Sequence, residues 1–169
     1  MTSPMYTNSV PVFKQLLTAM KTILATTAAD VAAKSINADA FLQARLFPDM
    51  FPLVKQVQIA CDFARGVSAR LAGVDVPAHE STETSFADLD ALLAMTLAFI
   101  DGLDATKFDG AESRDVVLRP GTPKERKLGG QAYLSSYGLP QFFFHATTTY
   151  AILRHNGVAI GKKDFMGAY

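Results

Sequence analysis

The chain has 169 residues, a mass of 18.2 kDa and as many acidic as basic side chains, 16 of each, so we expect one domain over residues 1–169 and no nucleic-acid partner. Its single cysteine, Cys61, excludes an intramolecular disulfide framework and a multi-cysteine zinc site. The N-terminus lacks a basic region followed by an apolar core, and no segment approaches the roughly 20 apolar residues that span a bilayer, so we expect an unprocessed cytoplasmic protein without a membrane partner.

The first half of the chain contains two stretches with the apolar period of a helix. Residues 5–29 carry apolar side chains three and four positions apart, which predicts a first helix with one buried stripe. A short helical turn is predicted over residues 40–45. A second stripe begins after Asp49 and ends at Gly73, a residue favoured in the left-handed position that closes a helix. The opposite face of this second helix is predicted to face solvent, and it carries Lys55, Gln58, Asp62 and Arg65.

A polar connection and a third helix follow. The connection over residues 74–83 contains His79, which is predicted to be exposed to solvent. Ser85 and Asp88 have the spacing of a capping pair and predict the start of a third helix, which should end near Gly102.

The pattern changes after the third helix. A β-hairpin is predicted over residues 114–128, where Arg-Pro-Gly-Thr at 119–122 is a turn signal. A fourth helix is predicted to begin at Leu139 or Pro140, because proline is tolerated in a first turn, and to end at Asn156. The predicted fold class is all-α: an antiparallel four-helix bundle with a short helix after helix one and a small β-hairpin between helices three and four.

The fourth helix contains the candidate functional site. His145 lies three residues after Phe142 and seven before Ile152, so it shares the inward face of this helix. Gln141 lies one turn earlier on the same side, and Gln56 belongs to an inward stripe of the second helix. The candidate ligand-binding residues are therefore His145, Gln141, Gln56, Phe142 and Thr149.

Several segments resemble a known family. The fourth helix, its closing Leu-Arg-His-Asn-Gly at 153–157 and the tail at 158–164 are similar to the end of the DinB/YfiT-like superfamily. The stretches Leu-Phe-Pro-Asp-Met-Phe-Pro-Leu at 46–53 and Phe-Phe-Phe-His at 142–145 resemble, more narrowly, a bacterial branch of unknown function within it. The resemblance covers nearly the whole chain in helix order.

The resemblance implies an up-and-down bundle of unusual connectivity that is frequently a homodimer. Metal-binding members of the superfamily hold a divalent ion with one histidine from helix two and two histidines, four residues apart, from helix four. In this chain these positions fall near Gln56 and on Gln141 and His145. Because amide oxygens are weak neutral ligands, zinc or nickel at His145 would be held far more weakly than by three imidazoles.

His145 has three interpretations. It is a buried histidine hydrogen-bonded to Gln56, Gln141 or Asp49, or a contact for a metal or small ligand, or a general acid or base. His155 has a simpler interpretation as a capping residue. It lies in the last helical turn, where a cation suits the negative end of the helix dipole.

Three functional hypotheses follow, and the sequence leaves open whether the protein is an enzyme. The first is a small-molecule-binding or weakly metal-binding protein with a cleft around His145. The second is a non-catalytic homodimer in which buried polar groups only specify a unique core. The third is a thiol-dependent transferase, by analogy of fold alone. A cleft beside His145 would favour the first hypothesis, and complete enclosure would favour the second.

Overall fold

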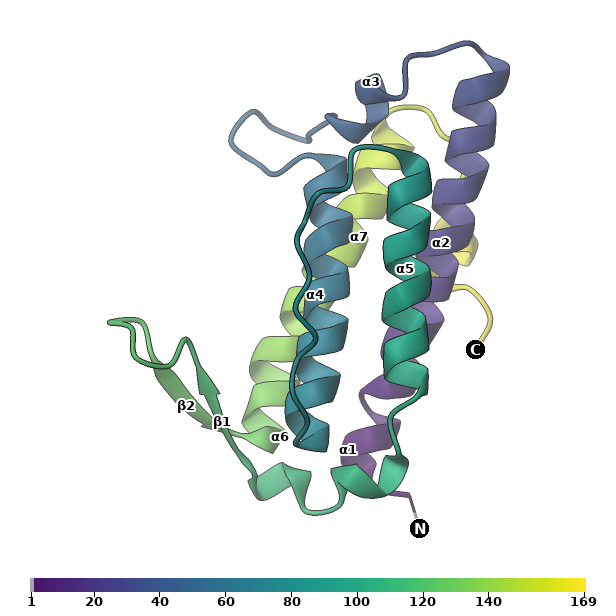
Figure 1. The fold of residues 1–169 in the computed structure, drawn as a ribbon. Helices are drawn as coiled ribbons and strands as arrows, with labels where there is room; N and C mark the ends of the chain where they lie inside the picture. Colours follow the sequence, from purple (N-terminus) through teal and green to yellow (C-terminus); the bar gives the residue numbers. More distant parts are fainter. Residues whose placement is uncertain (1) are drawn as a thin grey trace.

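The computed structural model describes residues 2–169, and this part of the chain is mostly helical with one small antiparallel sheet (Figure 1). The four long helices are α2 (Val10–Ala33), α4 (Leu53–Ala72), α5 (Phe86–Asp101) and α7 (Leu139–His155). The short helices are α1 (Pro4–Thr7), α3 (Asp39–Leu42), α6 (Gly130–Ala132) and α8 (Lys162–Met166). Two 3-10 turns, η1 (Ala105–Phe108) and η2 (Ala111–Ser113), precede the strands β1 (Asp115–Leu118) and β2 (Arg126–Gly129), and a π-helix, η3 (Tyr133–Gly138), joins α6 to α7.

The four long helices are not antiparallel throughout. Ion pairs from Lys14 to Asp101 and from Lys21 to Asp90 show that α2 and α5 run in opposite directions. Figure 1 shows α2 and α7 running one way and α4 and α5 the other. The expectation of an antiparallel bundle is therefore corrected for α4 and α5, which are parallel. The reason is the connection over residues 74–85, which returns along the whole length of α4 before α5 begins (Figure 1).

The first predicted helix is two helices. A break at Asn8 and Ser9 separates α1 from α2. Pro11 lies in the first turn of α2, and in an uninterrupted helix its ring would clash with the carbonyl of Thr7. The segment Pro4–Ala33 that contains both helices is long and apolar enough to cross a membrane by length and composition, and 44% of its most apolar window is buried inside the protein.

Helix α4 ends as predicted, but its polar face differs from the prediction. Gly73 closes α4 in the left-handed conformation with φ of 66°. Gln58 and Arg65, both expected in solvent, are only 4% and 3% exposed. The connection over residues 74–85 covers this face (Figure 1), and Gln58 Nε2 donates a 2.8 Å hydrogen bond to Glu83 in it.

Within the same connection, His79 pairs with Glu83 and is partly buried. Its Nε2 atom lies 2.6 Å from an Oε1 atom of Glu83, and the two side chains are 20% and 6% exposed. The prediction of a solvent-exposed His79 is therefore wrong. Glu83 attaches the connection to α4, because its carboxylate pairs both with His79 and with Gln58.

The capping and hairpin predictions are confirmed. Ser85 accepts a hydrogen bond from the backbone of Asp88, and the Asp88 side chain accepts one from Ser85 in return. Strands β1 and β2 pair antiparallel, with Asp115 opposite Gly129.

The last long helix, α7, begins at Leu139 as predicted, but further helical structure precedes it. Helical structure starts at Gly130 and continues through η3 into α7, so Pro140 lies well inside a helical run rather than at its start. An internal proline removes one backbone hydrogen bond and crowds the preceding turn. The wider π-helix ends two residues before Pro140 and accommodates this crowding.

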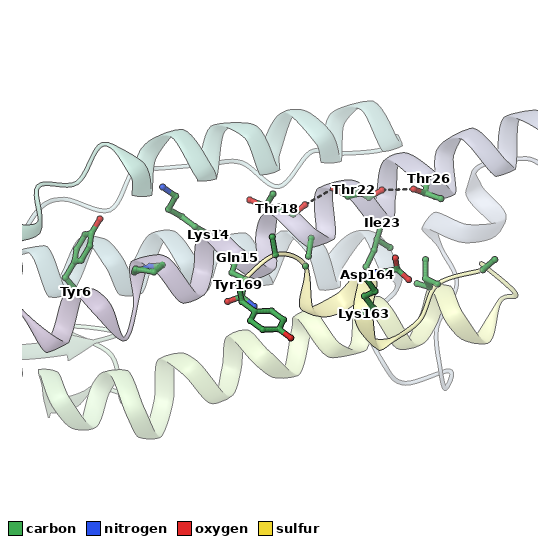
Figure 2. A pocket seen from close by; sticks show the side chains of 16 residues that line it. Tyr6, Lys14, Gln15, Thr18, Thr22, Ile23, Thr26, Lys163, Asp164 and Tyr169 are labelled. Atoms are coloured by element: carbon green, nitrogen blue, oxygen red, sulfur yellow. Dashed lines mark hydrogen bonds between the residues drawn. The ribbon is translucent and has the colours of Figure 1, made fainter.

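The C-terminal segment lies against the outer face of α2 (Figure 2). Gln15 Nε2 donates a 2.8 Å hydrogen bond to the carbonyl of Met166. On the other side of α8, the ring of Phe165 packs edge-on against Tyr150 of α7, with centroids 5.7 Å apart. Helix α8 thus bridges the first and last long helices.

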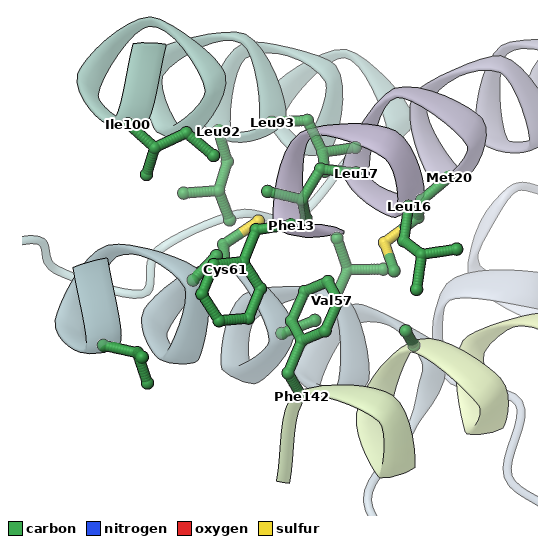
Figure 3. Close-up of a cluster of buried hydrophobic side chains, with 14 of the residues drawn as sticks. Phe13, Leu16, Leu17, Met20, Val57, Cys61, Leu92, Leu93, Ile100 and Phe142 are labelled. Carbon is green, nitrogen blue, oxygen red and sulfur yellow. The ribbon is translucent and has the colours of Figure 1, made fainter. Parts of the chain in front are cut away.

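The core lies between the four long helices (Figure 3). Phe13 and Phe142 meet edge to face at its centre, with ring centroids 4.8 Å apart. Cys61 is fully buried there, as predicted for a small apolar side chain. Other side chains of this cluster are Leu16, Leu17, Met20, Val57, Leu92, Leu93 and Ile100.

Candidate functional site

His145 is held across the helix interface by Gln56. Its Nδ1 atom lies 2.7 Å from Oε1 of Gln56, and Nε2 of Gln56 donates a 3.0 Å hydrogen bond to the carbonyl of Phe51. Because a carbonyl can only accept, the Gln56 amide nitrogen faces Phe51 and its oxygen faces the histidine. Nδ1 of His145 is therefore the protonated donor, and Nε2 carries the lone pair when the ring is neutral.

Aromatic rings surround the imidazole. The ring of Phe63 lies nearly parallel to it, with centroids 6.0 Å apart and 13° between planes, and the ring of Phe144 meets it edge-on at 5.2 Å. His145 is 7% exposed, and burial lowers its pKa below the usual 6.5. The ring is therefore neutral at physiological pH.

Nε2 of His145 has no hydrogen-bond partner among residues 2–169. The side-chain atoms there that are fully buried without a partner belong to Arg65, Ser68 and Thr96, and His145 is not one of these residues. The residue as a whole is 7% exposed. A neutral, fixed imidazole with one free lone pair is a hydrogen-bond acceptor and a competent base or ligand atom.

The structure separates the other candidate residues from this atom. Gln141 is half-buried and lines a cavity of about 230 Å³ with Tyr137 and Phe144, but it forms no hydrogen bond with His145. Phe142 is fully buried in the core, so its position does not support its assignment as a ligand-binding residue. Thr149 is 2% exposed and donates a 3.0 Å hydrogen bond to the carbonyl of His145, so its position does not support that assignment either.

The donor set does not fit the divalent ion that the fold family implies. Gln56 uses its amide oxygen on His145 and its amide nitrogen on Phe51, and Gln141 faces a different cavity. Within the described part of the chain, no three side chains of His, Cys, Asp or Glu form a group able to hold a metal ion. One imidazole with two weak amide donors is a poor site for zinc or nickel.

Tyr137 is a site residue that the sequence did not indicate. It lies in the π-helix, and its ring meets Phe63 edge-on with centroids 5.7 Å apart. It lines three cavities of about 660, 230 and 230 Å³, the last of which also contains Gln141 and Phe144. No pattern in the sequence signals a π-helix, so Tyr137 could not have been placed without the tertiary structure.

A separate groove of about 1010 Å³ lies between α2 and the C-terminal segment (Figure 2). Thr18, Thr22 and Thr26 line one wall, and the hydroxyls of Thr22 and Thr26 bond back to carbonyls of their own helix. The groove contains no histidine or cysteine. The hydroxyls of Thr22 and Thr26 are thus satisfied within their own helix.

Comparison with known proteins finds a family model and a solved structure to which the chain is similar. A family model described as a domain of unknown function (DUF1993) matches residues 5–166. Among solved structures, the chain is similar to a DinB family member protein from Shewanella denitrificans, with 36% sequence identity and a TM-score of 0.90 over 97% of this chain and 92% of that one. None of the curated proteins compared with the chain matches it.

Proposed function

Because this chain belongs to the DUF1993 family and has a DinB-like fold, for which the comparisons name no activity, we propose a function from its site: it binds a small molecule beside His145. One observation carries the proposal. A neutral, oriented imidazole with a free Nε2 lone pair contacts Phe144 edge-on, and Phe144 lines a cavity with Gln141, although His145 itself does not line that cavity.

The chemistry of Nε2 defines the class of ligand. As an acceptor it pairs with a ligand that donates a proton, such as a hydroxyl, an amide N–H or a thiol. Phe144 contacts the imidazole edge-on and also lines the cavity of about 230 Å³, which offers an apolar wall to the rest of a small ligand. Gln141 lines the same cavity as Phe144 and adds an amide that can donate and accept there.

The proposed ligand is organic rather than a catalytic metal. His145 is the only imidazole at the three positions where the resemblance implies metal ligands. The side-chain amides of Gln56 and Gln141 stand at the other two, and an amide is a poor substitute for an imidazole ligand. The thiol-transferase hypothesis has no support beyond analogy of fold, which is a poor guide to reaction.

Two substitutions separate binding from a purely structural role. His145→Asn keeps a side-chain N–H near the position of Nδ1 and so keeps the bond to Gln56, but it removes Nε2. His145→Ala removes both. Phenol serves as a proton-donating probe and toluene as its apolar match, each followed by NMR of the imidazole nitrogens in the wild type and by amide shifts around residue 145 in the variants.

We expect phenol, but not toluene, to shift the Nε2 resonance of the wild type, and His145→Asn to fold normally yet lose the response. Equal responses to both probes, or none to either, would sink the proposal. Metal content and zinc, nickel and manganese titrations of the wild type and His145→Ala test the metal hypothesis, since stoichiometric metal lost only in the variant would restore it.

A second candidate function is self-association through the aromatic side chains near the site. Phe47, Phe51 and Phe144 are 64%, 53% and 55% exposed, which is unusual for side chains of this size. A homodimer would bury them. Sedimentation velocity should then show a dimer that Phe144→Ser weakens, and a monomer at all concentrations would contradict this candidate.

A further inference from the structure

A cleft lies between the β-hairpin, the π-helix and α4. Two neighbouring cavities, of about 660 and 230 Å³, share the lining residues Leu118, Arg119 and Tyr137, and we call the pair the hairpin cleft. His145 does not line the hairpin cleft, although Tyr137 lines both this cleft and the cavity of Gln141 and Phe144.

The hairpin cleft has an excess of unpaired positive charge. Arg70 and Arg119 line it, and within residues 2–169 neither has a carboxylate at ion-pair distance. Arg70 Nη1 donates to the carbonyl of Gly66 at 3.0 Å and lies 3.4 Å from the hydroxyl of Tyr133, which leaves most of its guanidinium donors free. Lys124 and Arg126 line the larger part of the same cleft.

The acidic side chains of the cleft are already engaged. Asp62 forms an ion pair with the buried Arg65, and Glu125 accepts a 2.7 Å hydrogen bond from the backbone of Gly121. The whole chain has a net charge of zero, so this local excess of arginine and lysine is a property of the cleft and not of the composition.

Arg119 has a backbone conformation that an arginine seldom adopts. Its φ is 52°, in the left-handed region, where a side chain with a Cβ atom costs about 1 kcal/mol or more and glycine costs little. Strained residues of this kind are retained where the side chain serves a site. Here the strained turn holds Arg119 at a position where it lines both cavities.

Aromatic rings supply the other wall of the cleft. Tyr133 and Tyr137 lie one turn apart in the π-helix, with ring centroids 5.9 Å apart and 24° between planes. Tyr137 also contacts Phe63. Single π-helical turns are rare and occur frequently at functional sites.

We propose that the hairpin cleft binds a small organic anion with a flat ring, whose carboxylate or phosphate pairs with Arg70 and Arg119 and whose ring packs against Tyr137. Planar guanidinium groups suit such anions because they donate two parallel hydrogen bonds. This site goes beyond the proposed function at His145 and does not depend on it.

The test uses probes that separate charge from shape. Benzoate and phenyl phosphate carry both features, benzyl alcohol has the ring without the charge, and inorganic phosphate has the charge without the ring. Binding to the full chain is measured by calorimetry and by NMR of the arginine side chains. The variants are Arg119→Gly, which suits the left-handed backbone, and Arg70→Gln, with Arg154→Gln as a control that removes one charge outside the cleft.

We expect benzoate or phenyl phosphate to bind the wild type, with affinity reduced about tenfold or more in Arg119→Gly and Arg70→Gln and unchanged in Arg154→Gln. Arg119→Gly should keep its thermal stability, so its loss of binding is not a folding defect. Binding of benzoate should also survive in His145→Asn, which separates this site from the one at His145.

Three results would overturn the proposal. One is that neither aromatic anion binds the wild type at millimolar concentration. Another is that Arg154→Gln weakens binding as much as the cleft variants do, which would indicate general charge attraction. The third is that benzyl alcohol or inorganic phosphate binds as tightly as the aromatic anions, because the cleft would then not recognise ring and charge together.

Discussion

Gly130 lies directly against the carbonyl group of Ala111. A Cβ atom built on Gly130 would come within 1.8 Å of that carbonyl oxygen, a distance that no real contact allows. The neighbouring Gly129 has room, since its Cβ would lie 3.7 Å from the nearest atom, the carbonyl oxygen of Glu112. The close contact between the start of the last helical run and the η2 turn therefore requires a glycine at position 130 but not at position 129.

Substituting these two glycines should give opposite results. Gly130→Ala should lower the free energy of unfolding by roughly 3 kcal/mol or more, because backbone must move to admit the methyl group. Gly129→Ala, where φ is −69°, should change it by about 0.5 kcal/mol or less. Urea denaturation measures both, and similar losses in the two variants would show that the contact with Ala111 is not the cause.

The hydrogen bond between His145 and Gln56 should be measurable as a coupling energy. We expect His145→Ala and Gln56→Ala each to lower the free energy of unfolding by about 1–3 kcal/mol, because each leaves a buried polar partner unpaired. The double variant should lose less than the sum. His155→Ala is the control, since that histidine is exposed at the end of α7. Strict additivity would argue against a direct bond.

The lowered pKa of His145 predicts how stability depends on pH. Burial holds the folded-state pKa below the unfolded value of 6.5, so between these two pH values the unfolded state binds more protons. Stability contributed by the neutral ring is present above pH 6.5 and is lost as the pH falls through this window. Thermal unfolding from pH 7.5 to 5 should show a steeper loss for the wild type than for His145→Asn, and parallel curves would contradict the assignment.

Cys61 should be unreactive in the folded protein. It is fully buried, and burial raises the pKa of its thiol from 9.0 to about 12, so almost no thiolate exists at pH 8. Iodoacetamide should therefore label it only at the rate of unfolding, and completely in urea. Labelling within minutes under native conditions would show that this part of the core opens.

The buried Arg65 should be replaceable by an apolar residue, but its partner should not be removed. Arg65 is 3% exposed, and its Nε and Nη1 atoms have no partner among the described residues. Arg65→Met should be neutral or stabilising, whereas Asp62→Ala should cost about 1–3 kcal/mol because it removes the one carboxylate that pairs with this buried cation among the described residues. Chemical denaturation of both variants tests this, and a large loss in Arg65→Met would indicate an unseen partner.

Features encoded within a few residues were predictable. The left-handed Gly73, the capping pair Ser85 and Asp88 and the hairpin turn are local signals, and the structure contains each of them where the sequence indicated. That His145 and Gln56 both point inward also follows from helical period alone. Their meeting at 2.7 Å was one of three alternatives, since Gln141 and Asp49 were equally open partners.

Features that depend on contacts between distant segments were not predictable. Arg65 and Gln58 have the spacing of a solvent-facing stripe, yet both are buried, and Gln58 is hydrogen-bonded to Glu83 of the connection that runs along α4. The π-helix and the hairpin cleft likewise depend on how residues 114–138 fold against α4.

The sequence by itself thus determined the four long helical segments, where most of them end and which face of each carries the core, because hydrophobic period and capping act over one or two turns. Only the tertiary structure decided which polar groups are buried, that α4 and α5 run parallel, and that Arg70, Arg119 and Tyr137 share one cleft. These depend on the route of long connections, whose course is selected by the packing of the whole molecule rather than by any local preference.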